Sequence, residues 1–255
     1  MSSRHGSSRH GPSGIIVYDV PGRTSQPWTP NVWPVRLILN YKRLRHQTIR
    51  LEFQDIEHEL RKIGAEPSSY RSDGSPVYSL PVIVDPNVHP PRVISSPNKI
   101  ADYLEATYPA RPVFPEGTRA MQAMFVHFVQ EVLSKPLLPI MIPLSYQQLP
   151  DHTQSHFRAG MQPAGALVGP QREQQWLVIE EQFNFLAKIM DKNRADGDGI
   201  VCMGSNVTYA DFTICSILIW IERMAARDGW GRVRTWNHGR WARLWERCRE
   251  YMDEY

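Results

Sequence analysis

The sequence predicts an α/β domain followed by an all-α domain, and two features of its apolar pattern predict this division. Up to about residue 109, apolar residues come in short segments that alternate between strand and helix character. Beyond the segment YPARPVFPEG, they recur at i, i+3, i+4 and i+7, which is the spacing of an amphipathic helix. With 255 residues, 42% of them apolar, the chain is long enough to build both cores. We therefore expect domains at 15–109 and 117–255, joined by a linker at 110–116.

The first domain has the pattern of a mixed sheet. IIVYDV, beginning at Ile15, predicts a strand, residues 35–41 predict a helix, and QTIRLEF at 47–53 predicts a second strand. Strands joined by a helix are parallel, so these two form a βαβ unit. DIEHELRKIG at 55–64 predicts a short helix closed by glycine. LPVIVDP and RVIS then predict a strand pair, followed by a helix from about Pro97 to Thr107, so the order is βαβ–ββα with four strands.

The second domain is predicted to be a helical bundle. A first apolar stripe covers 121–133 and is expected to end where Pro136 lacks a backbone N–H. A second stripe covers 176–190, and a last one lies near the C-terminus. Thr208 and Asp211 have capping-box spacing directly before FTICSILIWI, which is apolar nearly all round. That segment is therefore expected to be a buried central helix.

The N-terminal segment and the net charge exclude several functional classes. MSSRHGSSRHGPSG at 1–14 is polar and has no apolar core, which predicts a disordered tail rather than a signal peptide. Two arginines of this tail supply most of the formal charge of +3, so a nucleic-acid partner is not indicated. No uninterrupted run of about 18 apolar residues is present, so no membrane association is expected.

Cysteine and histidine patterns give no sign of a metal or hydrolase site. Cys202, Cys215 and Cys248 are odd in number, widely spaced and never in a Cys-x-x-Cys pair. They are expected to be buried, reduced thiols of a cytoplasmic protein. The nine histidines form no HExxH motif, and no Gly-x-Ser-x-Gly marks a nucleophilic serine. We therefore predict no metal ligands.

Three segments of the first domain together predict a ligand site. WTPN at 28–31 precedes the first helix, and Pro81 opens the third strand, either as a strand start or after a cis bond. Ser96 and Pro97 are favoured residues for the N-cap and first position of the next helix. Helix N-termini present unpaired N–H groups and partial positive charge. An anionic ligand is therefore expected where these segments converge.

This combination resembles the soluble glutathione transferase superfamily. The features that carry the resemblance are the proline at the third strand and the Thr-x-x-Asp capping box of the helical domain. PNVW, LNYK, LPVIVDPN and IADYLEATYP are similar to the fungal FuA class and to the bacterial etherases that cleave lignin aryl ethers. The similarity runs from about Ile15 to the C-terminus. It implies a thioredoxin-like first domain, glutathione as cosubstrate, an aromatic second substrate and a homodimer.

The resemblance also implies roles for individual residues. Thr29 falls where the related class has a serine whose hydroxyl donates a hydrogen bond to the glutathione sulfur and favours the thiolate. The backbone of Leu80, before a cis-Pro81, falls where the cysteinyl part of glutathione pairs. Ser96 falls where an acid, followed by serine, binds the γ-glutamyl end. Because Pro97 takes the serine position, weakened affinity for glutathione is expected.

The start of the first helix decides how Thr29 is presented. With Thr29 as N-cap, Pro34 would interrupt the helical hydrogen bonds, whereas with Asn31 as N-cap it lies within the tolerant first turn. We therefore expect Asn31 to be the cap and Thr29 to lie on the preceding loop, free to point at a ligand. Asn31, or a backbone N–H near the helix start, is the alternative activating group.

Three functions fit these residues. The first is a glutathione transferase-like enzyme that conjugates or cleaves an aromatic electrophile, in detoxification or secondary metabolism. Met124, Phe125 and Phe128 are expected either to flank its cleft or to be plain core. The second is a non-catalytic protein that sequesters aromatic compounds in the same cleft. The third is a glutathione-dependent isomerase or lyase.

Overall fold

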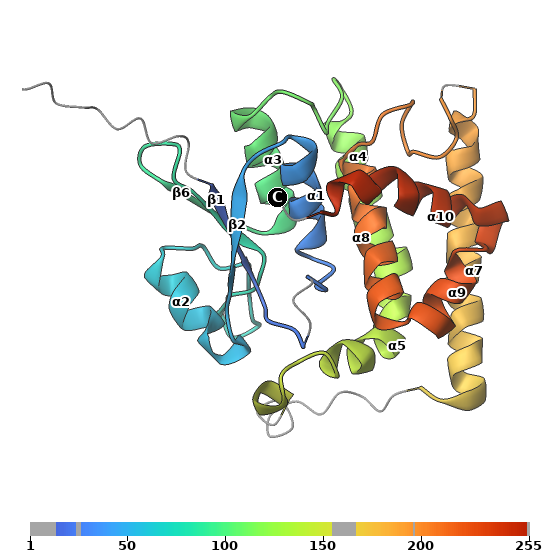
Figure 1. The fold of residues 1–255 in the computed structure, drawn as a ribbon, viewed down its shortest axis with the longest axis horizontal. Coiled ribbons are helices and arrows are strands. Elements are labelled where there is room, and N and C mark those ends of the chain that lie inside the picture. Colours follow the sequence, from blue (N-terminus) through green and yellow to red (C-terminus); the bar gives the residue numbers. More distant parts are fainter. Residues whose placement is uncertain (1–13, 24–26, 155–166, 196, 254–255) are drawn as a thin grey trace, which may run out of the picture.

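The structure, a computed structural model, describes residues 14–23, 27–154, 167–195 and 197–253. The predicted disordered tail at 1–14 therefore lies outside the described residues, apart from Gly14. Figure 1 shows a sheet-containing domain beside a bundle of helices, as the sequence predicts. The two domains meet where helix α1 (Trp33–Tyr41) packs against helix α8 (Tyr209–Met224).

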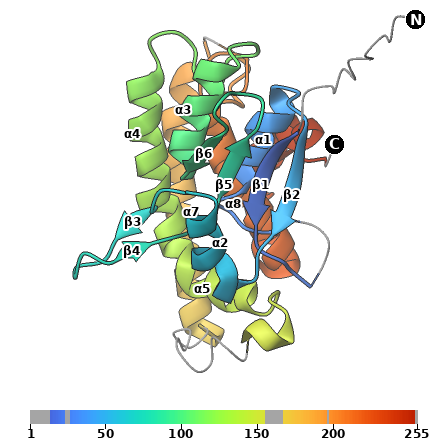
Figure 2. The same ribbon diagram turned by 90° about the vertical axis from the view of Figure 1, so that its left-hand side faces the viewer.

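The first domain contains a mixed four-stranded sheet in the order β2–β1–β5–β6, which confirms the predicted thioredoxin-like architecture. Its strands are β1 (Ile15–Asp19), β2 (His46–Arg50), β5 (Val82–Asp85) and β6 (Arg92–Ser95). β1 and β2 are parallel, whereas β5 pairs antiparallel with both β1 and β6. Helices α1 and α3 (Pro97–Thr107) cover one face of the sheet, and α2 (Ile56–Lys62) covers the other (Figures 1 and 2).

Two local features of the first domain differ from the prediction. The strand expected at 47–53 ends at Arg50, which lies opposite Asp19, the last residue of β1, so the ladder has no partner beyond it. The sequence analysis also missed a hairpin of two short strands, β3 (Ser69–Tyr70) and β4 (Pro76–Val77). Figure 2 shows this hairpin projecting from the domain. Strands of two residues are too short to show an alternating pattern.

The second domain is a bundle built around α8. The other helices whose bounds lie within the described residues include α4 (Arg119–Val129), α5 (Lys135–Tyr146), α7 (Gly169–Met190), α9 (Gly231–Val233) and α10 (Trp236–Cys248). Every residue of α8 from Tyr209 to Ile221 is buried, and the helix contacts α1, α4, α5 and α10. The Thr208 N–H donates to Asp211 Oδ2 at 2.8 Å and the Thr208 side chain accepts the Asp211 N–H, which completes the predicted capping box. The predicted central helix is thus confirmed.

The cysteines of this domain lie in its core. Cys202, Cys215 and Cys248 are free and buried, as the sequence predicts. Burial, together with the nearby Asp211 carboxyl group, raises the pKa of the Cys202 thiol well above its ordinary value. This thiol therefore stays protonated and behaves as a small apolar core group.

The structure contradicts the predicted helix end at Pro136. α4 continues through a π-helical turn, Gln130–Ser134, into α5, where Pro136 lies in the first turn. A π turn replaces i→i+4 bonds by i→i+5 bonds, so the chain tolerates the missing N–H. The continuous helix Arg119–Tyr146 is the one helix of the described residues that is long and apolar enough to cross a membrane, which the sequence analysis did not expect. Its contacts with α7 and α8 place one face inside the bundle, and core helices commonly meet the same criterion.

Candidate active site

A cavity of about 230 Å³ lies between the two domains, at the N-terminal ends of α1 and α3. The first domain contributes Pro30, Asn31 and Pro34 from the start of α1, and Pro97 from the start of α3. The second domain contributes residues of the continuous helix α4–α5 and of α8. The cavity therefore adjoins two of the three segments from which the sequence predicts a ligand site.

The wall from the second domain is largely apolar, and the Thr213 and Ser216 hydroxyl groups that α8 contributes are already bonded inside the protein. Its apolar side chains are Val126, Leu138, Ile142, Ile217 and Trp220. The Thr213 hydroxyl donates to the Tyr209 carbonyl at 2.9 Å, and the Ser216 hydroxyl donates to the Thr213 carbonyl at 2.7 Å. These bonds leave α8 with a surface that suits an apolar ligand.

Three polar side chains of the cavity have no such bond. Within the described part of the chain, the side chains of Asn31, Gln130 and Ser134 make no hydrogen bond, and each of them lines the cavity. Gln130 and Ser134 belong to the π-helical turn, so the turn that carries the helix past Pro136 also brings polar groups to the cleft. These three groups are available to a bound molecule.

Met124, Phe125 and Phe128, for which the sequence left open a place beside the cleft or in the core, are not among the residues that line the cavity. Met124 is exposed, and Phe125 and Phe128 pack against each other with ring centroids 6.4 Å apart. Phe128 also packs against Phe185 of α7, at 6.2 Å. The stripe chosen from the sequence therefore faces α7 and solvent, while the cavity is reached from the neighbouring helical face that contains Val126.

The start of α1 differs by one residue from the expectation. Val32, rather than Asn31, holds the N-cap position, and no side chain caps the helix. Trp33 is then the first helical residue and Pro34 the second, where a backbone N–H has no partner in the helix anyway. Asn31 is exposed on the preceding turn, in which the Val32 N–H donates to the Thr29 carbonyl at 3.2 Å. Asn31 therefore lines the cavity and does not cap the helix.

Thr29 lies on the loop, as expected, but its hydroxyl is not free. Thr29 Oγ1 donates to Asp19 Oδ1 at 2.7 Å. Asp19 ends β1, is only 1% exposed, and also accepts the Val20 N–H at 2.8 Å. Arg36 Nη2 lies 3.7 Å from Asp19 Oδ2. Burial raises the pKa of Asp19 above its ordinary value, and the Thr29 hydrogen bond and the Arg36 charge oppose that rise.

This bond changes what Thr29 can do. A hydroxyl has one proton, and Thr29 donates it in a hydrogen bond to the carboxyl group of Asp19, so only the lone pairs of Thr29 are left for a ligand. A thiolate needs a donor. The sequence analysis missed Asp19, although an acid at the end of the otherwise apolar IIVYD was a signal that could have revealed it.

Leu80, Pro81 and Ser96 meet at the edge of the sheet. The Leu80–Pro81 peptide is cis, as predicted, and the Pro81 carbonyl accepts the Ser96 N–H at 3.3 Å. Among the described residues, neither the Leu80 backbone nor the Ser96 hydroxyl has a hydrogen-bond partner. These groups are therefore open to a ligand beside Pro97.

Ser96 corrects one further expectation. It holds the N-cap position of α3, and its carbonyl accepts the Ile100 N–H, but its side chain makes no capping bond. Its φ is +78°, a left-handed conformation that a residue with a side chain adopts only at a cost of about 1–3 kcal/mol. The hydroxyl thus makes no bond to the helix that it was expected to cap.

The sheet domain, the helical bundle and the cavity between them are those of a glutathione transferase, and family models match both domains. The model described as "Glutathione S-transferase, N-terminal domain" matches residues 26–112. That described as "Glutathione S-transferase, C-terminal domain" matches residues 120–251. The chain therefore belongs to the glutathione S-transferase family.

Similar proteins agree with this assignment over nearly the whole chain. The structure of glutathione transferase GSTFuA3 from Phanerochaete chrysosporium is 32% identical, with a TM-score of 0.86, and the match covers 94% of this chain and 98% of that one. That of CsGST63524 from Ceriporiopsis subvermispora, in complex with glutathione, is 36% identical, with a TM-score of 0.84 and the same coverage. The glutathione S-transferase-like protein ustS of Aspergillus flavus is 24% identical, over 93% of this chain and 89% of that protein. The resemblance stated from the sequence is confirmed.

Proposed function

We propose that this protein acts on an aromatic electrophile bound in the cavity between the domains. It either conjugates glutathione to that molecule or uses glutathione to cleave it. Family membership supports the glutathione transferase-like part of this function. The aromatic second substrate is supported by the composition of the cavity. An apolar wall lies there together with unpaired polar groups, next to the Leu80 backbone and Ser96. An apolar pocket with a few convergent polar groups is typical of a small-molecule site.

The first domain has groups that fit glutathione, with one defect. The unpaired Leu80 N–H and C=O can pair with a peptide-like ligand, and the Ser96 hydroxyl can bond to a carboxylate. Bound glutathione supplies the nucleophilic thiol. The defect is Pro97, because the first residue of α3 has no N–H to offer to that carboxylate. Loss of one charge-assisted bond weakens binding by about 1.5–3 kcal/mol.

Asn31 is the residue that we propose as the donor to the sulfur. Asn31 lines the cavity and its amide makes no hydrogen bond to another described residue, whereas Thr29 donates its hydroxyl proton in a hydrogen bond to Asp19. A hydrogen bond to a charged acceptor is worth about 1.5–3 kcal/mol, which lowers a thiol pKa by about one to two units. Thr29 then acts as a positioning residue, because its carbonyl accepts the Val32 N–H in the turn that contains Asn31.

The second substrate is proposed to lie against α5 and α8. Leu138, Ile142 and Trp220 form a continuous apolar surface there, and the Trp220 indole N–H is already donated to Ser145 Oγ at 2.8 Å. Gln130 and Ser134 can bind an oxygen or nitro substituent at the edge of the ring. An aromatic molecule with one polar substituent fits this arrangement.

The test combines glutathione titration with turnover of a chlorodinitrobenzene. We expect saturable binding of glutathione and conjugation by the wild-type protein. Asn31→Ala is expected to lower turnover about ten- to hundredfold, since one charged hydrogen bond is lost. The matched control is Gln130→Ala, which removes an amide of the same cavity far from the thiol and should change mainly KM. Equal turnover of wild type and Asn31→Ala would refute the role of Asn31.

The sequestering function remains the second candidate, and two observations favour it. The Thr29 hydroxyl is held by Asp19, and Pro97 removes a donor from the glutathione site. Saturable binding of an aromatic dye in the cavity, without binding of glutathione or turnover, would establish this candidate over the transferase. If Ser96→Glu combined with Pro97→Ser restored glutathione binding, the loss of that binding would be due to these two positions of the first domain.

A further inference from the structure

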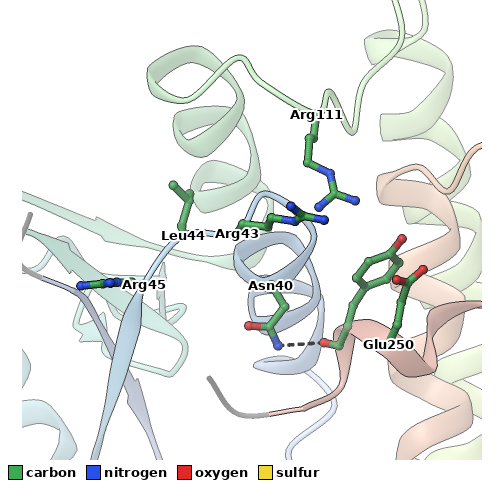
Figure 3. A pocket seen from close by; sticks show the side chains of 7 residues that line it. Asn40, Arg43, Leu44, Arg45, Arg111 and Glu250 are labelled. Atoms are coloured by element: carbon green, nitrogen blue, oxygen red, sulfur yellow. Dashed lines mark hydrogen bonds between the residues drawn. The ribbon is translucent and has the colours of Figure 1, made fainter.

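A second cavity, of about 450 Å³, lies at the opposite end of α1 from the cleft. Arg43, Arg45 and Arg111 line it together with Leu44, Glu250 and Tyr251. Figure 3 shows that the side chains of Arg43 and Arg111 point toward one another, whereas Arg45 points away along the sheet. The cavity shares no lining residue with the cleft between the domains.

The charges of this cavity are unbalanced. Arg43, Arg45 and Arg111 line it with one carboxylate, that of Glu250, and no ion pair links any of the three arginines to an acid among the described residues. Burial, together with the nearby Glu250 carboxylate, raises the pKa of Tyr251 to about 12. Positive charge thus exceeds negative charge among the described side chains of the cavity. Two facing guanidinium groups beside a single carboxylate favour the binding of an anion.

The guanidinium group of Arg111 is held in place for such a role. Its Cζ lies 4.6 Å from the centroid of the Tyr41 ring, in a cation–π contact. Stacking covers the flat face of a guanidinium and leaves the N–H groups at its edge free to bind an oxyanion. Arg111 therefore presents a fixed pair of donors to the cavity.

Both facing arginines extend from backbone positions that favour glycine. Arg43 has φ +57° and Arg111 has φ +56°. Arg43 closes α1 in the position where helices usually have glycine, and the Leu44 N–H donates back to the Leu39 carbonyl at 2.9 Å. A left-handed conformation costs a residue with a side chain about 1–2 kcal/mol. No ion pair to a described residue offsets this cost at Arg43, whereas a bound anion would.

The opposite wall of the cavity is fixed by Asn40. Its Nδ2 donates to the Tyr251 carbonyl at 2.8 Å and to the Asp253 carbonyl at 2.7 Å, which ties the C-terminal segment to α1. Figure 3 shows the first of these bonds. Tyr251, which this segment contains, lines the cavity and gives it an apolar ring surface.

We propose that this cavity binds a phosphate monoester, with the phosphate between Arg43 and Arg111 and the organic group against the Tyr251 ring. Two guanidinium forks match a group with three terminal oxygens and close to two negative charges. The apolar surface should favour an ester over inorganic phosphate, because inorganic phosphate has the charged group but no organic group to contact that surface. The proposal does not depend on the transferase chemistry of the cleft.

The experiment is calorimetric titration of the full chain with phenyl phosphate and, separately, with inorganic phosphate. We expect one saturable site per chain, with phenyl phosphate the tighter ligand. Arg43→Gly and Arg111→Gln should each weaken binding at least about tenfold. Arg227→Gln, which removes an exposed arginine elsewhere, and Asn31→Ala, which alters the cleft, should leave the affinity unchanged.

Arg43→Gly also separates lost binding from lost structure. Glycine adopts φ +57° without strain, so this variant should unfold at a higher temperature than wild type in the absence of ligand while binding phenyl phosphate less tightly. Absence of saturable binding to wild type would overturn the proposal, as would equal weakening in Arg227→Gln or Asn31→Ala. Equal affinity for inorganic phosphate would overturn the assignment to an ester.

Discussion

Replacing Thr29 by valine should destabilise the protein by an amount that depends on pH. The change keeps the shape of the side chain and removes the donor that Asp19 Oδ1 accepts at 2.7 Å. Above the pKa of Asp19 the acceptor is a buried carboxylate, so the loss of stability should be about 1.5–3 kcal/mol. For a chain of this length, that lowers the unfolding temperature by roughly 3–12 °C.

The sign of the pH dependence follows from Asp19. Because burial raises its pKa in the folded protein above 3.8, the folded state binds more protons than the unfolded state, and stability falls as pH rises through that window. Thr29→Val removes a group that opposes the rise, so the fall becomes steeper. In acid, where Asp19 is protonated, the free energy of unfolding of the variant should be only about 1 kcal/mol lower than that of wild type, because a hydrogen bond between neutral groups is worth about that much.

Urea unfolding followed by the fluorescence of the eight tryptophans would measure this difference. Thr213→Val is the matched control, because the buried Thr213 hydroxyl donates to a neutral carbonyl, that of Tyr209. Its loss in stability should be the same at both pH values, while Thr29→Ser should retain the stability of wild type. A loss in Thr29→Val that does not change with pH would refute the charged bond to Asp19.

Three further changes test the cap and the two ends of the cleft. Thr208→Ala should cost about 1–2 kcal/mol in urea unfolding without changing glutathione affinity, since it removes one half of the capping box with Asp211; an unchanged midpoint would contradict that capping role. Ser96→Glu combined with Pro97→Ser should tighten glutathione binding about tenfold or more by calorimetry, because a charge and an N–H are restored. In the pH profile of turnover, Asn31→Ala should raise the apparent thiol pKa by about one to two units, whereas a mere loss of packing would leave that pKa in place.

The layout of the fold could be predicted because it follows from local periodicity. Alternating segments predicted the mixed sheet, and the Thr208–Asp211 spacing predicted the start of the buried helix α8. The path through Pro136 could not be predicted in this way. A proline ends a helix unless the hydrogen bonds change register, and the π turn at Gln130–Ser134 that provides this change leaves no periodic signal.

The sequence predicted which segments form the candidate site, but it did not predict the hydrogen bonds within the site. The positions of Asn31, Leu80 and Ser96 on loops and helix starts follow from proline and N-cap preferences. The bond between Thr29 and Asp19 joins a loop to the end of a strand, and it depends on the depth of burial of the acid, which the sequence does not specify. For the same reason, the sequence did not show which face of α4 lines the cleft.

The most direct test of the central proposal is the thiol pKa of glutathione bound to this protein. Thiolate absorbance in the ultraviolet, recorded against pH with glutathione and saturating protein, gives that pKa for wild type and for Asn31→Ala. The proposal predicts a thiol pKa about one to two units below that of free glutathione in wild type, and return to the free value in Asn31→Ala. A bound thiol that titrates like free glutathione, or a lowered pKa that persists in Asn31→Ala, would contradict it.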